Sequence, residues 1–326
     1  MKRGSGLGLI ALAIMAGLTL LPAERLPAQP QRVLRIATQP GIGYGQLIVM
    51  QNLQMLEKRV PGLRVEWLKL TSGPVIRDAM LAGQVDVGSG GVAPFIIAWD
   101  RGVTWKIISA INEMPLYLNT YRPEIKTVRD FKPTDKIAMP AVGSIQHVVL
   151  QMAADKDLGA PTAFDSLVVS MAHPDGMFAL LSKREITAHL TSPPYQYLEL
   201  QTSGIHKIFD SYQIVGGPHT FNMVWAMDDF PKKHPDEYRA LLRSLEDATA
   251  FLTEHRDEAA KILAEAEKTE IGFMRAVLRN PEIRYTMTPH RLMQFVGFLK
   301  KIGTTKRVPS SWKELTFDEI HRLPGD

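Results

Sequence analysis

The strongest constraint on the fold is a regular alternation between short apolar runs and longer amphipathic runs with helical spacing. Val33 to Thr38 predicts a first strand, and residues 44–59 predict a helix that ends before Pro61 and Gly62. The pattern continues with strands predicted at 64–70, 85–89 and 104–111 and helices at 74–82 and 94–101. Such alternation is typical of parallel sheets joined by crossover helices. The sequence therefore predicts an α/β fold.

The length of the chain and a restart of the pattern predict two lobes. A chain of 326 residues is too long for one average domain. After an extended run at 116–121, strands are predicted at 136–139, 167–170 and 186–189 and a helix at 144–158, and a strand at 220–227 returns to the first lobe. We assign residues 29–120 and 213–326 to the first lobe and 121–212 to the second, with crossings near 118–122 and 211–217 that form a two-strand hinge. Helices predicted at 235–255, 256–267, 271–278 and 289–302 would pack on the first lobe.

The N-terminus has the features of a secretory signal peptide. Lys2 and Arg3 precede an apolar run from Leu7 to Leu21, which at about 15 residues is shorter than the roughly 20 of a spanning helix. Small residues allow cleavage after Ala23 or Ala28, and we assign residues 1–28 to the signal. An uncleaved membrane anchor is the alternative. The chain has no cysteine, so a lipid anchor on cysteine is excluded, and we expect a freely diffusing periplasmic protein.

Composition and missing motifs exclude several classes of function. The net charge of +4 is small, and the basic residues are scattered, so nucleic acid is not an expected partner. The sequence contains no H-E-x-x-H, no G-x-S-x-G and no closely spaced set of metal ligands. Without cysteine it has neither a thiol nucleophile nor a thiolate zinc site. We therefore expect no cofactor, no metal and no catalysis.

Four predicted junctions between a strand and a helix share one design, in which small or hydroxyl residues stand just before the helix. A helix N-terminus has unpaired N–H groups and a partial positive charge, so small residues there let an anion approach the backbone. Since ligands of open α/β sheets bind at the carboxyl ends of strands, the four junctions are expected to line one cleft. Ordinary helix capping is the alternative reading of each one. The junctions are Thr71-Ser72-Gly73-Pro74, Gly88-Ser89-Gly90-Gly91-Val92-Ala93-Pro94, Ala141-Val142-Gly143-Ser144 and Thr191-Ser192-Pro193-Pro194.

Two further segments supply candidate hydrogen-bonding groups. The first strand ends in a turn with Gln39, Gly43 and Tyr44, where the glycine frees the backbone and the other two side chains could contact a ligand. His147 stands one turn into its predicted helix and could donate to a ligand oxygen, although a lone histidine is equally consistent with a core or capping role. Asp175, in the turn His173-Pro174-Asp175-Gly176, is a possible cap or a partner for a ligand amine.

Several of these segments resemble one family of transport proteins. The sequence is similar to the periplasmic substrate-binding proteins of the nitrate, sulfonate and taurine class of ABC importers, which are related to a pyrimidine-precursor-binding branch. A further branch of the same superfamily, the yeast-type pyrimidine synthases, consists of enzymes that resemble proteins dependent on a cysteine-rich motif, and this chain has no cysteine. The segments that carry the resemblance are Ile36-Ala37-Thr38, Thr71-Ser72-Gly73-Pro74, Leu81-Ala82-Gly83-Gln84-Val85-Asp86-Val87-Gly88, Ala93-Pro94-Phe95 and Thr191-Ser192-Pro193-Pro194-Tyr195-Gln196.

The resemblance implies a type II periplasmic-binding fold with a hinged cleft that closes on the ligand. It also implies a monomer that delivers its ligand to a permease of the inner membrane and its ATPase. A sulfonate, taurine-like or nitrate-like anion is the first ligand class. A pyrimidine-like compound or an aromatic acid is the alternative, and a periplasmic enzyme or sensor partner is a third hypothesis. The residues carried over to the cleft are Thr38, Gln39, Thr71, Ser72, Ser89, Gly90, Gly91, Val142, Gly143, Ser144, Thr191 and Ser192, with no arginine among them.

Overall fold

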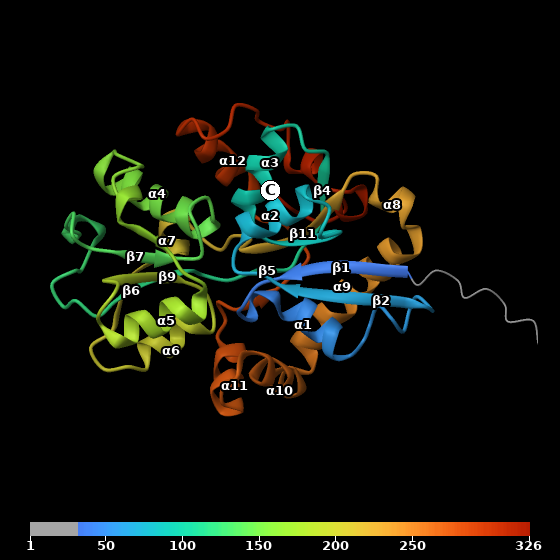
Figure 1. The fold of residues 1–326 in the computed structure, drawn as a ribbon, viewed down its shortest axis with the longest axis horizontal. Coiled ribbons are helices and arrows are strands. Elements are labelled where there is room, and N and C mark those ends of the chain that lie inside the picture. The colour runs from blue at the N-terminus through green and yellow to red at the C-terminus, as the bar shows by residue number, and fades with distance from the viewer. Residues whose placement is uncertain (1–31) are drawn as a thin grey trace, which may run out of the picture. The chain divides into compact units, whose positions relative to one another are not determined.

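Two five-stranded sheets organise the chain (Figure 1). The computed structural model describes residues 32–326, so the predicted signal peptide lies outside the described residues. The first sheet has the order β2 (Leu63–Lys69), β1 (Arg32–Thr38), β3 (Val87–Gly91), β11 (Asn222–Met227) and β4 (Trp105–Ala110). The second has the order β10 (His206–Asp210), β6 (Tyr117–Thr120), β9 (Ala188–Thr191), β7 (Ile137–Met139) and β8 (Val168–Ser170). We propose that each sheet is the centre of one expected lobe.

Both sheets are mixed, whereas the alternation predicted parallel sheets. In the first sheet β1 pairs in parallel with β2 and β3, but β11 pairs antiparallel with β3 and β4. In the second sheet β7 is parallel to β8 and β9, and β6 is antiparallel to β9 and β10. The antiparallel strands β6 and β11 are those that enter a sheet directly from the other half of the molecule. They have no preceding crossover helix to return them in the parallel direction.

Helices cover both sheets. Those of the first sheet are α1 (Gly45–Asn52), α2 (Gly73–Leu81), α3 (Val92–Asp100), α8 (Phe230–Lys233), α9 (Pro235–Glu254), α10 (Arg256–Glu267), α11 (Ile271–Arg279) and α12 (Leu292–Lys301). Those of the second sheet are α4 (Ile145–Leu158), α5 (His173–Ser182), α6 (Tyr195–Leu200) and α7 (Ser211–Val215). In Figure 1, α2 and α3 lie above β1 and β2, and α1 lies below them. The C-terminal helices pack on this half as expected, α9 and α10 against α1 and α12 against α3.

Helix α1 is shorter than the amphipathic pattern predicted. It ends at Asn52, and the chain runs through successive turns up to the predicted end at Arg59. Gln54 has a φ of 51°, in the left-handed region that interrupts an α-helix. The apolar residues beyond Gln54 lie in turns, and two of them, Leu56 and Val60, are buried in the core.

The chain crosses between the two halves twice, and the two crossings are hydrogen-bonded to each other. The first crossing, between β4 and β6, contains β5 (Asn112–Glu113), which pairs with β12 (Arg284–Tyr285). The backbone N–H of Ser211 donates to the Leu116 carbonyl at 2.8 Å, and the Leu116 N–H donates to the Ser211 hydroxyl at 2.9 Å. Strand β6 already belongs to the second sheet, so this crossing lies a few residues before the predicted one.

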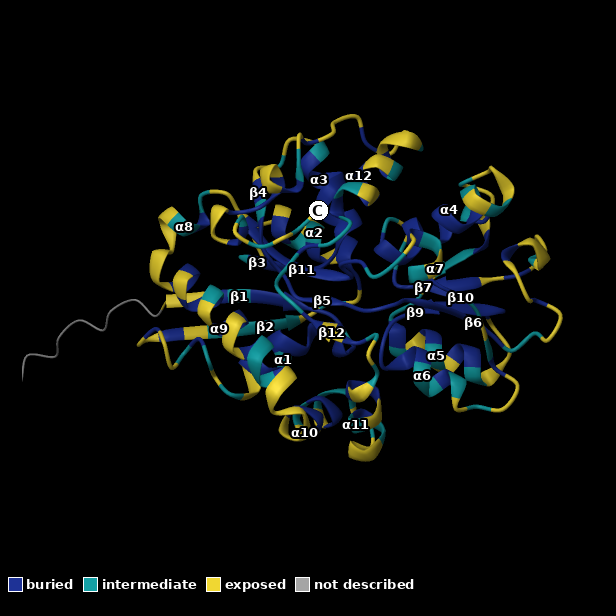
Figure 2. Ribbon diagram, turned by 180° about the vertical axis from the view of Figure 1, so that it is seen from behind, coloured by how far each residue is buried: buried dark blue, intermediate teal, exposed yellow. Residues whose placement is uncertain are grey.

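The core lies mainly between the sheets and their helices (Figure 2). Trp105, Trp225 and Phe95 are fully buried in the first half, with ring centroids 5.6 to 5.9 Å apart. Each such ring removes a large apolar area from water. Within residues 32–326, no helix combines the length and apolarity that crossing a membrane requires.

Candidate functional site

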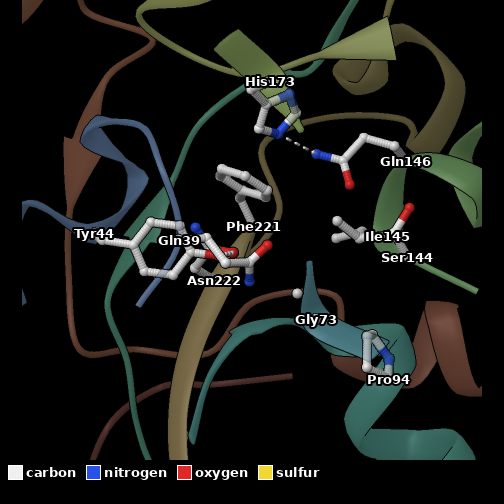
Figure 3. A pocket seen from close by; sticks show the side chains of 11 residues that line it. Gln39, Tyr44, Gly73, Pro94, Ser144, Ile145, Gln146, His173, Phe221 and Asn222 are labelled. Carbon is white, nitrogen blue, oxygen red and sulfur yellow. Dashed lines mark hydrogen bonds between the residues drawn. The ribbon is translucent and has the colours of Figure 1, made fainter. Parts of the chain in front are cut away.

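A narrow cavity brings together the helix starts and strand ends of both sheets. Its volume is only about 10 Å³, which is room for the centre of roughly one water molecule. A larger ligand can enter only if the walls part. The cavity is lined by Gln39, Tyr44, Gly73, Gly91, Pro94, Ser144, Ile145, Gln146, His173, Phe221 and Asn222 (Figure 3).

The helix starts at the cavity are formed by the local sequence. Ser72 caps α2 by accepting the Val75 N–H at 3.4 Å, and Ser144 caps α4 by accepting the His147 N–H at 3.3 Å. Gly91 precedes α3, which starts two residues before the predicted position at Pro94. The first N–H groups of a helix have no partner within it. The starts of α2, α3 and α4 therefore direct backbone donors and partial positive charge toward the cavity.

The wall from the first sheet carries three polar side chains. Tyr44 donates to the Asn222 side-chain oxygen at 3.3 Å, and the Asn222 amide donates to the Gly43 carbonyl at 3.2 Å. Burial raises the pKa of Tyr44 well above its usual 10, so its hydroxyl stays protonated. The Gln39 amide donates to the Ser89 carbonyl at 3.4 Å. These bonds fix the side chains in place on one side of the cavity.

The wall from the second sheet is a buried histidine between two polar side chains. His173 is the first residue of α5, and its Nδ1 lies 2.9 Å from the Thr191 hydroxyl. Its Nε2 lies 3.3 Å from the amide nitrogen of Gln146. Figure 3 shows His173 and Gln146 together on the side of the cavity opposite Gln39 and Tyr44. Polar groups from both halves thus surround the same space.

The lining is polar but carries no formal charge. Among the described residues that line the cavity there is no lysine, arginine, aspartate or glutamate. Burial and the neighbouring His189 ring hold the pKa of His173 well below its usual range, so His173 is neutral. An anion here would be held by backbone N–H groups, carboxamides and hydroxyls, as the lack of arginine in the junctions indicates.

The two halves touch at the cavity through a glycine. A Cβ on Gly91 would lie 2.6 Å from Cγ2 and 2.7 Å from Cβ of Ile145, which is the first residue of α4. Such distances are too short for carbon atoms, so only a glycine allows this approach. The backbone of Gly91 has a φ of −69°, which any residue can adopt. Glycine is therefore required here because a side chain would not fit between the two halves, and not because of the backbone conformation.

Hydrogen bonds outside the cavity also join the halves. The Ile42 N–H donates to the Pro193 carbonyl at 3.2 Å. Tyr195 of α6 donates to Glu267 of α10 at 2.5 Å, and that carboxylate is also 3.4 Å from the Lys69 ammonium. Since the Glu267 side chain is only 1% exposed, this contact is well shielded from water.

Five of the sixteen expected site residues line the cavity: Gln39, Tyr44, Gly73, Gly91 and Ser144. Several of the others support them from behind. Ser72 is a cap, the Ser89 hydroxyl donates to the Ala37 carbonyl at 2.5 Å, and Thr191 contacts His173. The remaining expected residues adjoin these segments: Thr38, Gly43, Thr71, Gly90, Val142, Gly143, His147 and Ser192.

Three expected residues do not line the cavity and have surroundings that do not by themselves indicate a ligand contact. Val142 is 59% exposed, and Thr71 is also exposed. His147 accepts the Gly143 N–H through Nδ1 at 3.3 Å, and its Nε2 lies 3.1 Å from the Asp165 carboxylate, so both ring nitrogens already have partners. Their assignment to the ligand site stays a prediction.

Six lining residues were not among the expected site residues. Pro94 is the last residue of the second junction but was not given a ligand role. Ile145 and Gln146 directly follow the third junction, so a wider window there would have included them. His173 lies in the predicted turn before α5, where it was not given a ligand role. Phe221 precedes the returning strand β11 and Asn222 is its first residue, and no local signal separates them from ordinary strand residues.

Comparison with known proteins identifies the family of this chain and its relatives. The model of the NMT1-like family matches residues 27–266. A protein of Escherichia coli (strain K12), named as a candidate aliphatic sulfonates-binding protein, is 26% identical over 261 residues, which is 78% of each chain.

Solved structures share the fold. The alkanesulfonate-binding protein SsuA from Xanthomonas axonopodis pv. citri, bound to MOPS, superposes with a TM-score of 0.71 at 17% identity, over 86% of this chain and 96% of its own. The periplasmic nitrate-binding protein NrtA from Synechocystis PCC 6803 gives 0.69 at 13% identity, over 89% and 87%. These similarities confirm the periplasmic-binding fold that the sequence predicted.

Proposed function

Because this chain belongs to the NMT1-like family, we propose that it is the periplasmic solute-binding component of an ABC importer. Its ligand is a small polar anion of the sulfonate or nitrate kind, and it delivers this ligand to a membrane permease with its ATPase without changing it chemically. The observation that supports this most is the cavity at which the starts of α2, α3 and α4 meet from both sheets. Aligned backbone donors of this kind stabilise anions.

The supporting contacts also suggest how the ligand is retained. A ligand in the cavity touches both halves only when they are closed, so its contacts favour the closed state. The crossings at Leu116 and Ser211 are the positions at which the halves can rotate. Closure then hides the ligand until the permease opens the protein.

A thermal-shift screen tests the ligand class. We expect methanesulfonate, taurine or nitrate to raise the melting temperature, since a ligand at 100 times its Kd stabilises a folded protein by about 2.7 kcal/mol. Sodium chloride at equal ionic strength is the control. No shift with any sulfonate or with nitrate, together with a shift for another class of compound, would contradict the anion assignment. Chemical turnover of a compound that binds would show an enzyme.

A neutral aromatic or heteroaromatic ligand is the second candidate, and the lining itself favours it. No charged side chain lies among the described lining residues, while the rings of Tyr44 and Phe221 do. Carboxamides such as Gln39 and Asn222 pair well with the edge of a heterocycle. The same screen, extended to pyrimidines and aromatic acids, separates the two candidates.

Closure itself can be tested at Gly91. We expect Gly91→Ala to weaken ligand binding about 10- to 100-fold, because the added Cβ clashes with Ile145 only when the halves meet, and overpacking costs about 1–3 kcal/mol. Titration calorimetry measures the loss. The double variant with Ile145→Gly, which removes both clashing carbon atoms, should regain most of the affinity. Equal binding by Gly91→Ala and the unaltered protein would show that the ligand is held without this contact.

A further inference from the structure

His173 is held on both sides by polar groups inside the cavity wall. Nδ1 lies 2.9 Å from the Thr191 hydroxyl and Nε2 lies 3.3 Å from the Gln146 carboxamide. The residue is 4% exposed, so these contacts form away from bulk water. Both His173 and Gln146 also line the cavity (Figure 3). A change in one contact therefore reaches the ligand space directly.

The surroundings of His173 favour an uncharged ring. Burial is the main cause of its lowered pKa, followed by the His189 ring, whose centroid is 5.8 Å away. His189 in turn contacts the Glu199 carboxylate at 2.6 Å, and the ring of Tyr195 stacks on His173 with centroids 5.8 Å apart. A neutral imidazole has one N–H donor and one acceptor nitrogen. Its tautomer therefore decides which neighbour receives a hydrogen bond.

Two hydrogen-bond arrangements fit the same positions of the heavy atoms. In the first, Nδ1–H donates to Thr191, Nε2 accepts the Gln146 N–H, and the Gln146 oxygen is left for the cavity. In the second, Thr191 donates to Nδ1, Nε2–H donates to the Gln146 oxygen, and the Gln146 NH2 group is left for the cavity. A carboxamide has nearly the same shape after a half-turn, so the exchange requires no repacking.

The first arrangement is that of Figure 3, in which the Gln146 nitrogen faces His173. An oxyanion offers only acceptors, and a carboxamide oxygen would repel it. An oxyanion therefore binds better when the NH2 group faces the cavity. A ligand with its own N–H, such as a sulfonamide, binds better when the oxygen does.

We propose that the tautomer of His173 sets whether Gln146 offers an acceptor or a donor to the ligand, and that a bound oxyanion selects the Nε2–H tautomer. His173 is then a positioning residue, and Gln146 is the residue that discriminates between ligands. This inference rests on the proposed function of the cavity. A ligand shifts such an equilibrium only through its different affinity for the two states.

The tautomer can be observed directly by NMR of protein labelled with ¹⁵N-histidine. Long-range ¹H–¹⁵N spectra distinguish the two neutral tautomers, and the His173 signals are assigned by their loss in His173→Gln. We expect the Nδ1–H pattern in the free protein and the Nε2–H pattern at saturating methanesulfonate. An Nδ1–H pattern that persists in the saturated protein would overturn the inference while leaving sulfonate binding intact. Failure of methanesulfonate to bind would overturn both the inference and the proposed function for sulfonates.

Thr191→Val removes the hydroxyl that contacts His173 Nδ1 and replaces threonine with a side chain of the same shape. An orphaned buried N–H is rarer in proteins than an under-satisfied acceptor, so loss of the hydroxyl favours the Nε2–H tautomer. The preference for methanesulfonate over the similarly shaped methanesulfonamide should then rise about tenfold, the worth of one neutral hydrogen bond. Gln146→Glu, which offers acceptors only, should shift the preference toward the sulfonamide. An unchanged ratio in both variants would contradict the inference.

Discussion

Glu199→Ala should destabilise the protein by about 3–5 kcal/mol, which is the cost of removing one partner from a fully buried pair of polar or charged groups. The Glu199 carboxylate accepts from His189 Nδ1 at 2.6 Å and from the Asn119 amide at 2.8 Å, and the side chains of His189 and Glu199 are completely buried. Without Glu199 the buried His189 Nδ1 loses its acceptor, and the Asn119 amide keeps only the Gln196 carbonyl at 3.1 Å. Urea unfolding followed by circular dichroism measures the loss.

Two controls separate this effect from a general loss of charge. Glu199→Gln keeps an acceptor of similar shape and should lose less stability than Glu199→Ala. Glu124→Ala removes an exposed carboxylate that pairs with Arg122, and its unfolding midpoint should not change measurably. A Glu199→Ala variant as stable as Glu124→Ala would show that the buried contacts of Glu199 do not stabilise the folded protein.

The same substitution also has a consequence for the ligand site. His189 and His173 lie on neighbouring parts of the second half, with ring centroids 5.8 Å apart. Glu199 holds His189, and His173 forms the cavity wall. Glu199 therefore supports, through His189, the histidine that forms the cavity wall.

Local patterns predicted most of the helices and strands. The helix predicted at 235–255 is α9, one residue shorter, and the one predicted at 256–267 is α10 without change. Long amphipathic runs constrain such helices strongly. Strand β10 was missed because His206–Asp210 is short and half-exposed, so its apolar residues show no clear alternation. Strand direction was also missed, because it depends on the path of the chain between the halves.

The sequence indicated where the cavity lies but not which side chains line it. Gly73, Gly91 and Ser144 stand at strand ends before helices, and the rule that such ends converge agrees with their common position at the cavity, while their role as ligand-binding residues stays a prediction. The contact of Gln146 with His173 joins α4 to α5 and depends on the orientation of both helices. Asn222 reaches the cavity from a strand that returns from the other half. No local spacing encodes contacts of this kind.

His219 should make the protein progressively less stable as the pH falls below 6.5. It lies in the second crossing, where burial lowers its pKa from the usual 6.5 to about 4. Above pH 6.5 the folded and unfolded states are both neutral here, so pH has no effect through this group. Between pH 6.5 and 4 the unfolded chain takes up a proton that the folded chain does not, which costs about 3 kcal/mol in total.

The hydrogen bonds around His219 explain why its neutral form is required. The Thr220 carbonyl lies 2.9 Å from Nδ1 and can only accept, so Nδ1 carries the proton. Nε2 then accepts from the Ser211 hydroxyl at 2.8 Å, while the same hydroxyl oxygen accepts the Leu116 N–H. Protonation of Nε2 would turn an acceptor into a donor, so the Ser211 hydroxyl would lose the nitrogen that accepts its proton.

Urea unfolding at pH 7.5 and pH 5 of the unaltered protein and of His219→Gln tests this prediction. The variant should be less stable at pH 7.5, but it should lose less stability on acidification, by up to about 2 kcal/mol, because glutamine does not titrate. Equal losses in the two proteins would contradict it. If the variant does not fold, titration of the His219 ring signal by NMR decides the matter, since a midpoint above pH 6 in the folded protein is incompatible with the buried neutral ring.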